Sequence, residues 1–334
     1  MRKLASIRRI DSIRPIPGAD AIECAVLGGW TVVVKRDEFR AGDLAVYCEI
    51  DSWIPHELAP FLSRGQEPRE FEGVRGERLR TVKLRGQLSQ GLLLPYATVG
   101  RICAEGEDVS ETLGIIKWEA PIPAQLAGEV KGAFPGFIPK TDQERVQNLA
   151  SELAQWRQDR VAWEVTEKLD GSSMTVFYRD GEVGVCSRNL ELRDTPNNTL
   201  WQVAHRDGIA SLLYDLGRNL AIQGELVGEG IQGNPYRIRG QSFYVFDIYD
   251  IDAGHYLVPA ARQSFCEDNE LMHVPVLMNK ITDVTTSMEE LLASAEGASE
   301  LREATEREGL VFKRLDANVS FKAISNRFLL RGGN

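Results

Sequence analysis

The sequence is poor in cysteine and histidine, which excludes several classes of site. Its 334 residues include five cysteines and four histidines. No cysteine pair has the spacing of a zinc site or a disulfide framework, and neither HxH nor HExxH occurs. We therefore expect free thiols in the reducing environment of the cytoplasm.

Long apolar runs are also missing. No stretch approaches the ~20 residues that span a bilayer. The first residues, MRKLASIRRIDSIRPIP, are basic but lack the apolar region of a signal peptide. We expect a soluble cytoplasmic protein with no membrane partner, long enough for two domains.

The net charge of −10 argues against a uniformly nucleic-acid-binding surface, but the charge is uneven. Residues 1–120 hold 17 Lys+Arg and 18 Asp+Glu, whereas the remainder holds 22 and 31. Local patches decide contact with nucleic acid, so that contact stays open.

The first third of the chain reads as short strands separated by turns. Many strands at such close spacing are typical of a small barrel. Proline and glycine then become dense, which predicts a linker. We expect domains at 1–120 and 141–334, joined by a linker at 121–140.

The second part mixes helices and strands without a βαβ rhythm, which indicates an α+β domain. Residues 142–160 have helical periodicity, with Val146, Leu149, Leu153 and Trp156 on one face. Further helices are expected over 199–217 and 288–304. Strands are expected over 161–171, 173–181, 182–189, 220–230, 241–250, 308–316 and 319–325.

The sharpest chemical signal is the segment EKLDGSS, residues 167–173. A strand lysine, Lys168, is followed by Asp170 and Gly171. An amine attacks phosphorus when its pKa is depressed, and glycine lets the backbone approach a phosphate or sugar. An exposed lysine before a turn is the other interpretation of this motif alone.

Five further motifs follow in order: SRN at 187–189, GE at 224–225, FxxFDI at 243–248, EGxVxK at 308–313 and a lysine strand at 319–325. Together with KxDG, they resemble the covalent nucleotidyltransferase superfamily of ATP-dependent RNA and DNA ligases and capping enzymes. The longer segments that contain these motifs most resemble those of the RNA ligases: EKLDGSS, CSRN, FYVFDI, REGLVFK and SFKAISNRFLL.

The N-terminal part of the chain shows which group of RNA ligases the sequence resembles. Residues 13–55, KLRGQLSQGLLLP and PKTDQERVQN resemble the Naegleria-type RNA ligases, in which an OB domain precedes the transferase domain. The resemblance thus implies an N-terminal OB-type barrel and a C-terminal nucleotidyltransferase domain. Many DNA ligases and capping enzymes instead carry the OB domain after the transferase domain.

The resemblance implies a three-step reaction that uses ATP and Mg²⁺ or Mn²⁺. Lysine forms lysyl-AMP, AMP passes to an RNA 5′-phosphate, and a 3′-hydroxyl then displaces AMP. We expect a monomer that seals 3′-hydroxyl and 5′-phosphate RNA ends in RNA repair. The alternatives are a DNA ligase, a capping-type guanylyltransferase, or a nucleic-acid-binding module with an inactive transferase fold.

The resemblance also assigns roles. Lys168 is the nucleophile. Asp170, Glu225 and Glu308 are expected to bind metal, its waters or ribose. Glu167 is expected at the nucleotide, and Phe246 is expected to stack on adenine. Core packing could explain Phe246 instead, and the solvated acidic run Glu303, Glu306 and Glu308 could explain Glu308.

Basic and amide side chains complete the expected site. Arg188 and Asn189 are expected at ribose or the RNA ends, unless they form a plain turn. Lys313 and Lys322 are expected near the α-phosphate. Some relatives carry a second lysine where this chain has Ser320, so we favour Lys322. Arg145 is expected at the pyrophosphate, and a surface helix position is its alternative.

Residues 75–86, RGERLRTVKLRG, form a basic stretch in the expected barrel. On a strand, Thr81, Lys83 and Arg85 project to one side. We expect Lys83 and Arg85 to bind RNA, as OB barrels bind nucleic-acid backbones. A charged edge strand that resists aggregation is the alternative.

Overall fold

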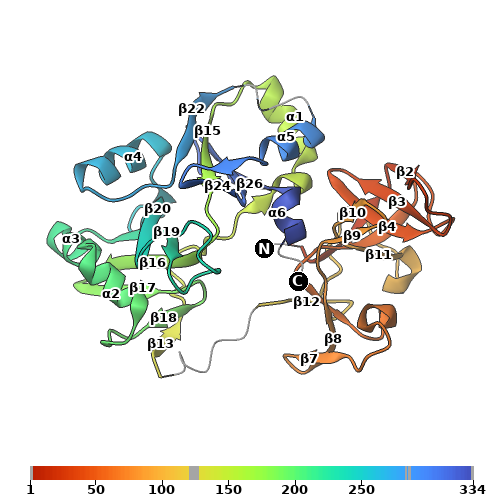
Figure 1. The fold of residues 1–334 in the computed structure, drawn as a ribbon, viewed down its shortest axis with the longest axis horizontal. Coiled ribbons are helices and arrows are strands. Elements are labelled where there is room, and N and C mark those ends of the chain that lie inside the picture. The colour runs from red at the N-terminus through yellow and green to blue at the C-terminus, as the bar shows by residue number, and fades with distance from the viewer. Residues whose placement is uncertain (1–2, 120–127, 283, 285–286, 332–334) are drawn as a thin grey trace. The chain divides into compact units, whose positions relative to one another are not determined.

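The computed structural model describes residues 3–119, 128–282, 284 and 287–331 (Figure 1). The chain divides into two compact units, Met1–Pro121 with Leu329–Asn334, and Ile122–Phe328. None of the helices in the described ranges has the length and apolar character needed to cross a lipid bilayer. Part of the expected linker, residues 121–127, lies outside the described residues.

The first unit consists of short strands that pair antiparallel, as the strand-and-turn pattern predicted. The three-stranded sheets are β1 (Ala5–Arg9), β5 (Leu44–Cys48) and β11 (Leu92–Pro95), and β2 (Ser12–Pro15), β3 (Ile22–Leu27) and β4 (Trp30–Lys35). A four-stranded sheet has the order β12 (Ile116–Lys117), β6 (Ser52–Pro55), β8 (Val74–Arg78) and β7 (Arg69–Phe71). A hairpin of β9 (Val82–Leu84) and β10 (Gln87–Ser89) and the 3₁₀ turns η1 (Pro60–Ser63) and η2 (Tyr96–Val99) complete the unit.

Strand β5 is buried on both faces. Val46 and Cys48 join one apolar cluster, whereas Ala45 and Tyr47 join another. Because successive side chains of a strand point to opposite faces, β5 lies between two apolar layers. This is the packing expected of a small closed or nearly closed sheet.

The second unit contains two larger sheets. Seven antiparallel strands have the order β13 (Val130–Ala133), β18 (Leu190–Leu192), β17 (Glu182–Cys186), β16 (Ser172–Arg179), β19 (Leu220–Gly228), β20 (Gln241–Asp250) and β21 (His255–Tyr256). Five strands have the order β14 (Glu144–Arg145), β26 (Ser320–Ile324), β25 (Gly309–Arg314), β15 (Trp163–Lys168) and β22 (Val276–Ile281). Only the β14–β26 pair of these is parallel. Smaller elements are η4 (Val146–Asn148), α4 (Pro259–Asp268), α6 (Asn326–Arg331), β23 (Ala298–Ser299) and β24 (Arg302–Glu306).

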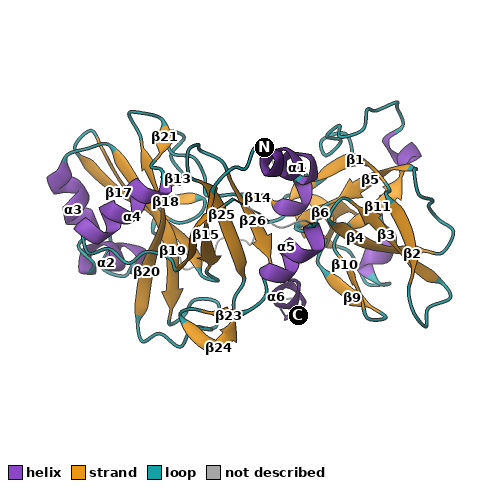
Figure 2. Ribbon diagram, turned by 90° about the horizontal axis from the view of Figure 1, so that it is seen from above, coloured by secondary structure: helices purple, strands orange, loops and turns teal. Residues whose placement is uncertain are grey.

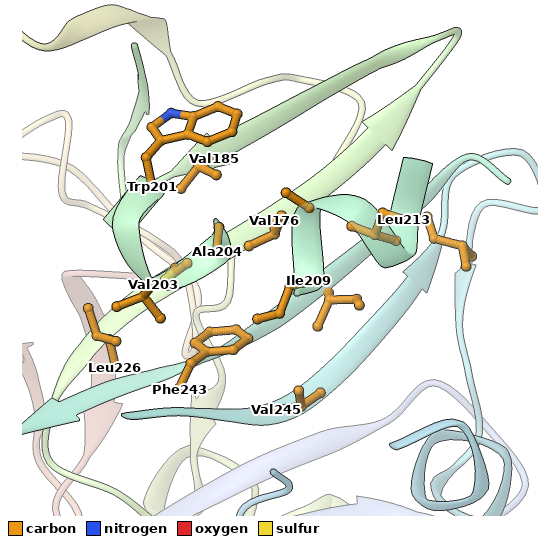
Figure 3. Close-up of a cluster of buried hydrophobic side chains, with 14 of the residues drawn as sticks. Val176, Val185, Trp201, Val203, Ala204, Ile209, Leu213, Leu226, Phe243 and Val245 are labelled. Atoms are coloured by element: carbon orange, nitrogen blue, oxygen red, sulfur yellow. The ribbon is translucent and has the colours of Figure 1, made fainter. Parts of the chain in front are cut away.

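Two helices cover the outer face of the seven-stranded sheet. They are α2 (Thr199–Arg206) and α3 (Ile209–Leu216), and Figure 3 shows their buried side chains against the strands. Val203 and Leu213 meet Val176, Leu226 and Phe243 there. Burial of this apolar surface fixes the outer face, so the other face of the sheet is left for the site.

Helices α1 (Ala150–Gln158) and α5 (Met288–Ser294) cover the five-stranded sheet in the same way. Trp156 stacks on Phe321 at a centroid distance of 5.9 Å. Trp163 and Val165 of β15 belong to this cluster. The predicted apolar face, Val146, Leu149, Leu153 and Trp156, packs here as expected, although its first turn is the 3₁₀ segment η4.

The alternation along β15 sends its other side chains toward the larger sheet. Glu164, Thr166 and Lys168 therefore lie on the face opposite Trp163 and Val165. Figure 2 shows β15 and β25 beside β19 and β20. Ion pairs from β15 and β25 to residues of the larger sheet and α4 confirm that the two sheets face each other.

Three helix predictions were wrong in part. In the expected helix over 142–160, residues 144–145 form β14 because they pair with β26, residues 146–148 form η4, and α1 begins only at Ala150. The expected helix over 199–217 is broken by Gly208, whose φ of 70° is left-handed. The expected helix over 288–304 ends at Ser294, and residues 298–306 form the β23–β24 hairpin. Gly297 has a φ of 146°, which no helix accommodates, so the helical composition beyond it is overridden.

Strand β13 falls in the stretch expected as linker and adds to the larger sheet through β18. The division into domains at 120 and 140 stays a proposal.

Candidate active site

Lys168 is the last residue of β15 and lies between the two sheets. It pairs with Gly309 of β25, so Glu308 directly precedes its partner. The Lys168 Nζ lies 2.6 Å from Glu308 Oε2, and 24% of the lysine side chain is exposed. The KxDG and EGxVxK motifs, 140 residues apart, are therefore neighbours.

The turn after Lys168 packs on β19. Ser173 pairs with Glu225, which brings the GE motif to the nucleophile. A Cβ on Gly171 would lie 2.4 Å from Leu226 O and 2.9 Å from Glu225 Cγ. Glycine is thus required by close packing of protein against protein, a reason that differs from the expected approach to a phosphate or sugar.

Four charged groups set the electrostatics of this turn. Burial lowers the pKa of Lys168, but the negative charges of Glu308 and Glu225 outweigh burial, so the pKa stands above its ordinary value. Burial, followed by the charge of Glu308, raises the pKa of Asp170 to about 6. Burial raises the pKa of Glu225 to about 8 against the opposing charge of Lys168. Lys168 is therefore protonated at neutral pH in the free protein.

The carboxylates do not form a ready-made metal cage. In the described ranges, no group of three His, Cys, Asp or Glu side chains is placed to hold an ion. Mg²⁺ usually keeps several waters and shares phosphate oxygens with few carboxylates. Binding of metal by Asp170, Glu225 and Glu308 stays a prediction that fits this arrangement.

Glu167 is buried on the opposite side of β15. Its Oε2 accepts a 2.8 Å hydrogen bond from Glu300 N. Its Oε1 is buried and has no hydrogen-bond partner of normal geometry. Burial raises the pKa of this carboxyl, with an opposing contribution from Ser299. Glu167 thus points to the other face of β15 from Lys168, and its expected contact with the nucleotide stays a prediction.

Phe246 occupies a β-bulge. Gln223 pairs with Asp247 and Gly224 with Val245, so Phe246 is the extra residue of β20. Lys313 Nζ donates a 2.6 Å hydrogen bond to Phe246 O and lies 5.7 Å from the ring centroid. Bulges re-aim side chains next to active sites, and this one fixes the ring between the sheets.

A buried charge network supports the bulge. Lys313 pairs with Asp247, and Arg262 of α4, fully buried, pairs with Glu164. Arg262 Nε also donates to His273 Nε2 at 2.9 Å. Burial lowers the pKa of Lys313 to about 8, although Asp247 opposes the shift. Lys313 is thus engaged with Phe246 and Asp247, and its expected contact with the α-phosphate stays a prediction.

Arg145 and Lys322 are brought side by side. They are direct partners in the parallel β14–β26 pair. Arg145 is buried on a strand, so the alternative of a surface helix position was wrong. Lys322 also pairs with Val311, two residues from Gly309 on β25, and Ser320 pairs with Lys313. Two cations therefore lie side by side on β14 and β26, and β26 is the strand next to β25.

Arg188 and Asn189 are tied to the segment that precedes β14. Arg188 makes a 2.6 Å ion pair with Asp142, and Asn189 Oδ1 accepts from Lys140 Nζ at 3.0 Å. Both side-chain contacts are exposed. The SRN motif is thus an anchored turn, and its contact with ribose or RNA stays a prediction.

A 270 Å³ pocket opens at the Lys313 end of β25. It is lined by Lys140, Asp142, Asp247, Arg262, Lys313, Asn318 and Ser320 among others, and not by Lys168. The pocket therefore borders the supports of Phe246 and not the lysine turn.

The basic stretch of the first unit is less uniform than expected. Lys83 lies on β9 and is exposed, but β9 ends at Leu84. Arg85 and Gly86 form the hairpin turn with φ values of 49° and 85°. The expected strand geometry, with both side chains on one side, was wrong, because a two-residue hairpin with left-handed φ at both positions takes Arg85 out of the strand.

Sequence reasoning missed Tyr236, Asp247 and Arg262. Tyr236 OH accepts a 2.7 Å hydrogen bond from Asp170 N. Asp247 lies inside the FxxFDI motif, which carried a signal, but only its aromatic residue was assigned. Arg262 follows no motif, and nothing in the sequence marks it.

Comparison with known proteins agrees with this geometry. The RNA ligase family model matches residues 161–324, and an OB-fold domain model matches residues 4–96. A solved RNA ligase from Naegleria gruberi is 50% identical over 98% of this chain. The chain belongs to the RNA ligase family. No curated protein matches it. The OB barrel followed by an α+β nucleotidyltransferase domain is therefore confirmed.

Solved structures of one protein cover almost the whole chain. The Naegleria gruberi RNA ligase, as a mutant in the apo form, is 50% identical, with a TM-score of 0.90 over 98% of this chain and 97% of that one. A mutant with ATP and Mn has the same identity and TM-score, over 98% of each chain. A form with pyrophosphate has a TM-score of 0.89 at 50% identity over 98% of each chain.

Proposed function

We propose that this RNA ligase is adenylylated by ATP at Lys168 and seals RNA 3′-hydroxyl and 5′-phosphate ends. The observation that carries the proposal is the placement of Lys168 against Glu308 and Glu225, with Asp170 on the same turn. A lysine nucleophile, carboxylates for a divalent ion and nearby cations are what phosphoryl transfer requires.

The residues present fit ATP and a divalent metal. Naegleria gruberi RNA ligase has been solved with ATP and Mn. Here the Phe246 bulge offers a flat apolar face for a purine. Arg145 and Lys322 are paired cations suited to the phosphates. Asp170, Glu225 and Glu308 would hold the metal or its waters, which would supply charge neutralisation.

In the proposed reaction, the Lys168 Nζ loses its proton and forms a bond to the α-phosphorus while the bond to the β-phosphate oxygen breaks. Pyrophosphate leaves. A 5′-phosphate oxygen of RNA then displaces Lys168 from the adenylyl group. Finally the 3′-hydroxyl attacks the 5′-phosphorus, a phosphodiester forms and AMP leaves. Each step is an in-line transfer, so positioning contributes most.

The proton on Lys168 is the main electrostatic barrier in the free protein. Glu308 and Glu225 hold the pKa above its ordinary value. When a bound cation neutralises Glu308, Glu225 and Asp170, the charges that raise the pKa of Lys168 are offset, and the remaining effect of burial lowers that pKa. We infer that the charged ligands, bound together, convert Lys168 into a neutral nucleophile.

The test is label transfer from α-labelled ATP to the protein. Lys168→Ala should abolish transfer, whereas Lys280→Ala, at an exposed lysine of β22, should not. Lys168→Ala should still seal RNA that already carries AMP on its 5′ end. Undiminished labelling of Lys168→Ala would refute the assignment. Parallel reactions with GTP and with nicked DNA show whether adenine and RNA are preferred.

We also propose that the protein acts as a monomer in the cytoplasm in RNA repair. One chain carries every residue of the proposed site, and all five cysteines are free and buried. Sedimentation of the active enzyme tests the oligomeric state.

A further inference from the structure

The loop between β19 and β20, residues 229–240, packs directly against the turn that follows the nucleophile. Tyr236 OH accepts a 2.7 Å hydrogen bond from Asp170 N, and Gln232 Nε2 donates to Gly171 O at 3.2 Å. Tyr236 is buried in one cluster with Leu169 and Val227. Both polar contacts thus fix this loop to the residues that follow Lys168.

Hydrogen bonds within the loop and to β24 support its conformation. Asn234 bonds through its side chain to both Ile238 N and Ile238 O, at 3.0 and 2.9 Å. Arg302 and Thr305 of β24 donate to Pro235 O. Three residues that are not glycine, Gln232, Asn234 and Arg237, have left-handed φ values of 46°, 50° and 54°. Such strain persists where the surroundings enforce it, and it clusters at functional sites.

Two arginines project from this rigid loop. Arg237 and Arg239 are exposed. Tyr236, which precedes Arg237, and Ile238, which lies between the two arginines, pack into the apolar cluster. Neither arginine makes an ion pair or a side-chain hydrogen bond within the described ranges. Two available guanidinium groups are therefore carried by the loop that packs against the Lys168 turn.

The negative charge around the Lys168 turn indicates why cations are needed near it. The turn gathers Asp170, Glu225 and Glu308 around one lysine, in a chain of net charge −10. An RNA strand that approaches this turn is repelled by the carboxylates. Exposed cations next to the turn offset that repulsion, and guanidinium groups bind phosphates through two parallel hydrogen bonds.

We propose that Arg237 and Arg239 form a phosphate-binding site for the RNA strand next to the ends that are joined. The inference rests on the proposed ligase function. Because Tyr236 and Gln232 fix the loop to the turn that follows Lys168, phosphates held by the arginines would lie near the ends that are joined. The site would contribute to RNA binding and sealing and not to the adenylylation of Lys168.

The test compares two double variants. Arg237→Ala with Arg239→Ala removes the proposed site. The control, Arg160→Ala with Lys280→Ala, removes two exposed charges at the opposite end of β15, where Trp163 pairs with Ile281. Arg160 has a left-handed φ of 51°, which matches Arg237. Both variants therefore lose the same charge and keep similar backbone strain.

Three quantities are measured for each variant. They are lysyl-AMP formation, the Kd of a 5′-phosphorylated RNA with a blocked 3′ end across salt concentrations, and the sealing of pre-adenylylated RNA. In the loop variant, the Kd should rise roughly tenfold at low salt, and the slope of log Kd against log salt should fall by about 1 to 2. Lysyl-AMP formation should equal that of the control, and lysine at both positions should restore most of the binding.

Two results would overturn the proposal. One is RNA binding by the loop variant that equals the control. The other is a raised KM for ATP with unchanged RNA binding, which would place the arginines at the nucleotide. If the unaltered protein itself fails to form lysyl-AMP, the proposed function fails, whereas the RNA-binding comparison still decides the role of the loop. Thermal unfolding of the lysine variant separates a loss of contact from a loss of fold.

Discussion

Glu308 Oε2 accepts a 2.6 Å hydrogen bond from the Nζ of Lys168 across the adjacent strands β25 and β15. The carboxylate that holds the lysine in place is thus also a group that keeps it protonated. These two effects have opposite consequences for nucleophilic attack, and substitution separates them.

Glu308→Gln tests which effect dominates. Loss of the negative charge lowers the pKa of Lys168, so a carboxylate that only paired with lysine would give faster adenylylation when removed. We expect the reverse, a loss of ~10²-fold or more, because a group that neutralises charge in the transition state is worth that much. Rates of lysyl-AMP formation decide it. Glu303→Gln, in the nearby acidic run, should react normally, and a near-normal Glu308→Gln would assign Glu308 to that run.

The pKa values of the carboxylates predict how metal use depends on pH. Asp170 has a pKa of about 6 and Glu225 of about 8 in the free protein. Below these values, protons compete with the metal for the same oxygens. The Mn²⁺ concentration that gives half-maximal adenylylation should therefore fall as pH rises from 5.5 to 8 and level off above that. A half-maximal concentration that is independent of pH would contradict metal binding by these carboxyls.

Glu225 should also limit the stability of the metal-free protein. Its pKa rises from 4.5 to about 8 on folding, so the folded state holds a proton that the unfolded state has released between these values. The contribution of Glu225 to stability is thus present at low pH and lost as pH rises through 8. Glu225→Gln should raise Tm at pH 8.5, by about 2–4 °C per kcal/mol gained, and the gain should shrink at pH 5.

The Glu225→Gln variant should change catalytic activity as well as stability. Glu225→Gln should lose adenylylation while it gains stability, as expected where a strained site is retained for function. A variant less stable than the parent at pH 8.5 would show that pairing with Lys168 outweighs the burial of the carboxylate.

Arg262 should be important for both stability and the Phe246 bulge. Removal of one partner of a buried pair leaves an uncompensated charge, so Arg262→Ala should cost about 3–5 kcal/mol in free energy of unfolding. Arg314→Ala, which breaks a partly exposed pair with Asp316, should cost about 1 kcal/mol or less. Denaturant midpoints measure both. The double variant Arg262→Met with Glu164→Gln should recover part of the loss, and an unrecovered loss would contradict the pairing argument.

The exposed hairpin of the first unit supplies a separate prediction. If Lys83 and Arg85 hold RNA, alanine at both positions should reduce RNA sealing and weaken the salt dependence of RNA binding. Lysyl-AMP formation should be spared, because the proposed ATP site lies in the second unit. A variant defective in lysyl-AMP formation but normal in joining pre-adenylylated RNA would instead connect the hairpin to the nucleotide.

Much of the site could be predicted from sequence because its strands carry recognisable motifs. Lys168, Glu225, Glu308 and Lys322 come from four separate motifs, and the strand pairings bring their segments together. The apolar face of 146–156 was also predicted, because helical period and burial agree there. In these places local pattern and tertiary packing point to the same structure.

The rest could not be predicted because it depends on contacts distant in sequence. Arg262 pairs with Glu164, 98 residues away, and no local pattern marks a buried arginine on a helix. The 298–306 hairpin has helical composition, but Gly297 and pairing between its strands override it. Arg85 was misplaced because a turn, and not strand alternation, decides its direction.

The position of β15 in its sheet has a consequence for the timing of synthesis. Lys168 is on a strand between β22 and β25, and Arg145 pairs with Lys322 of β26, so every neighbour of these strands is made more than a hundred residues later. In a chain still emerging from the ribosome, Lys168 is synthesised well before the strands that pair with β15. We therefore expect the enzyme to stay unreactive toward nucleotide until the later strands have been made and have paired, and pairing over such separations is slow.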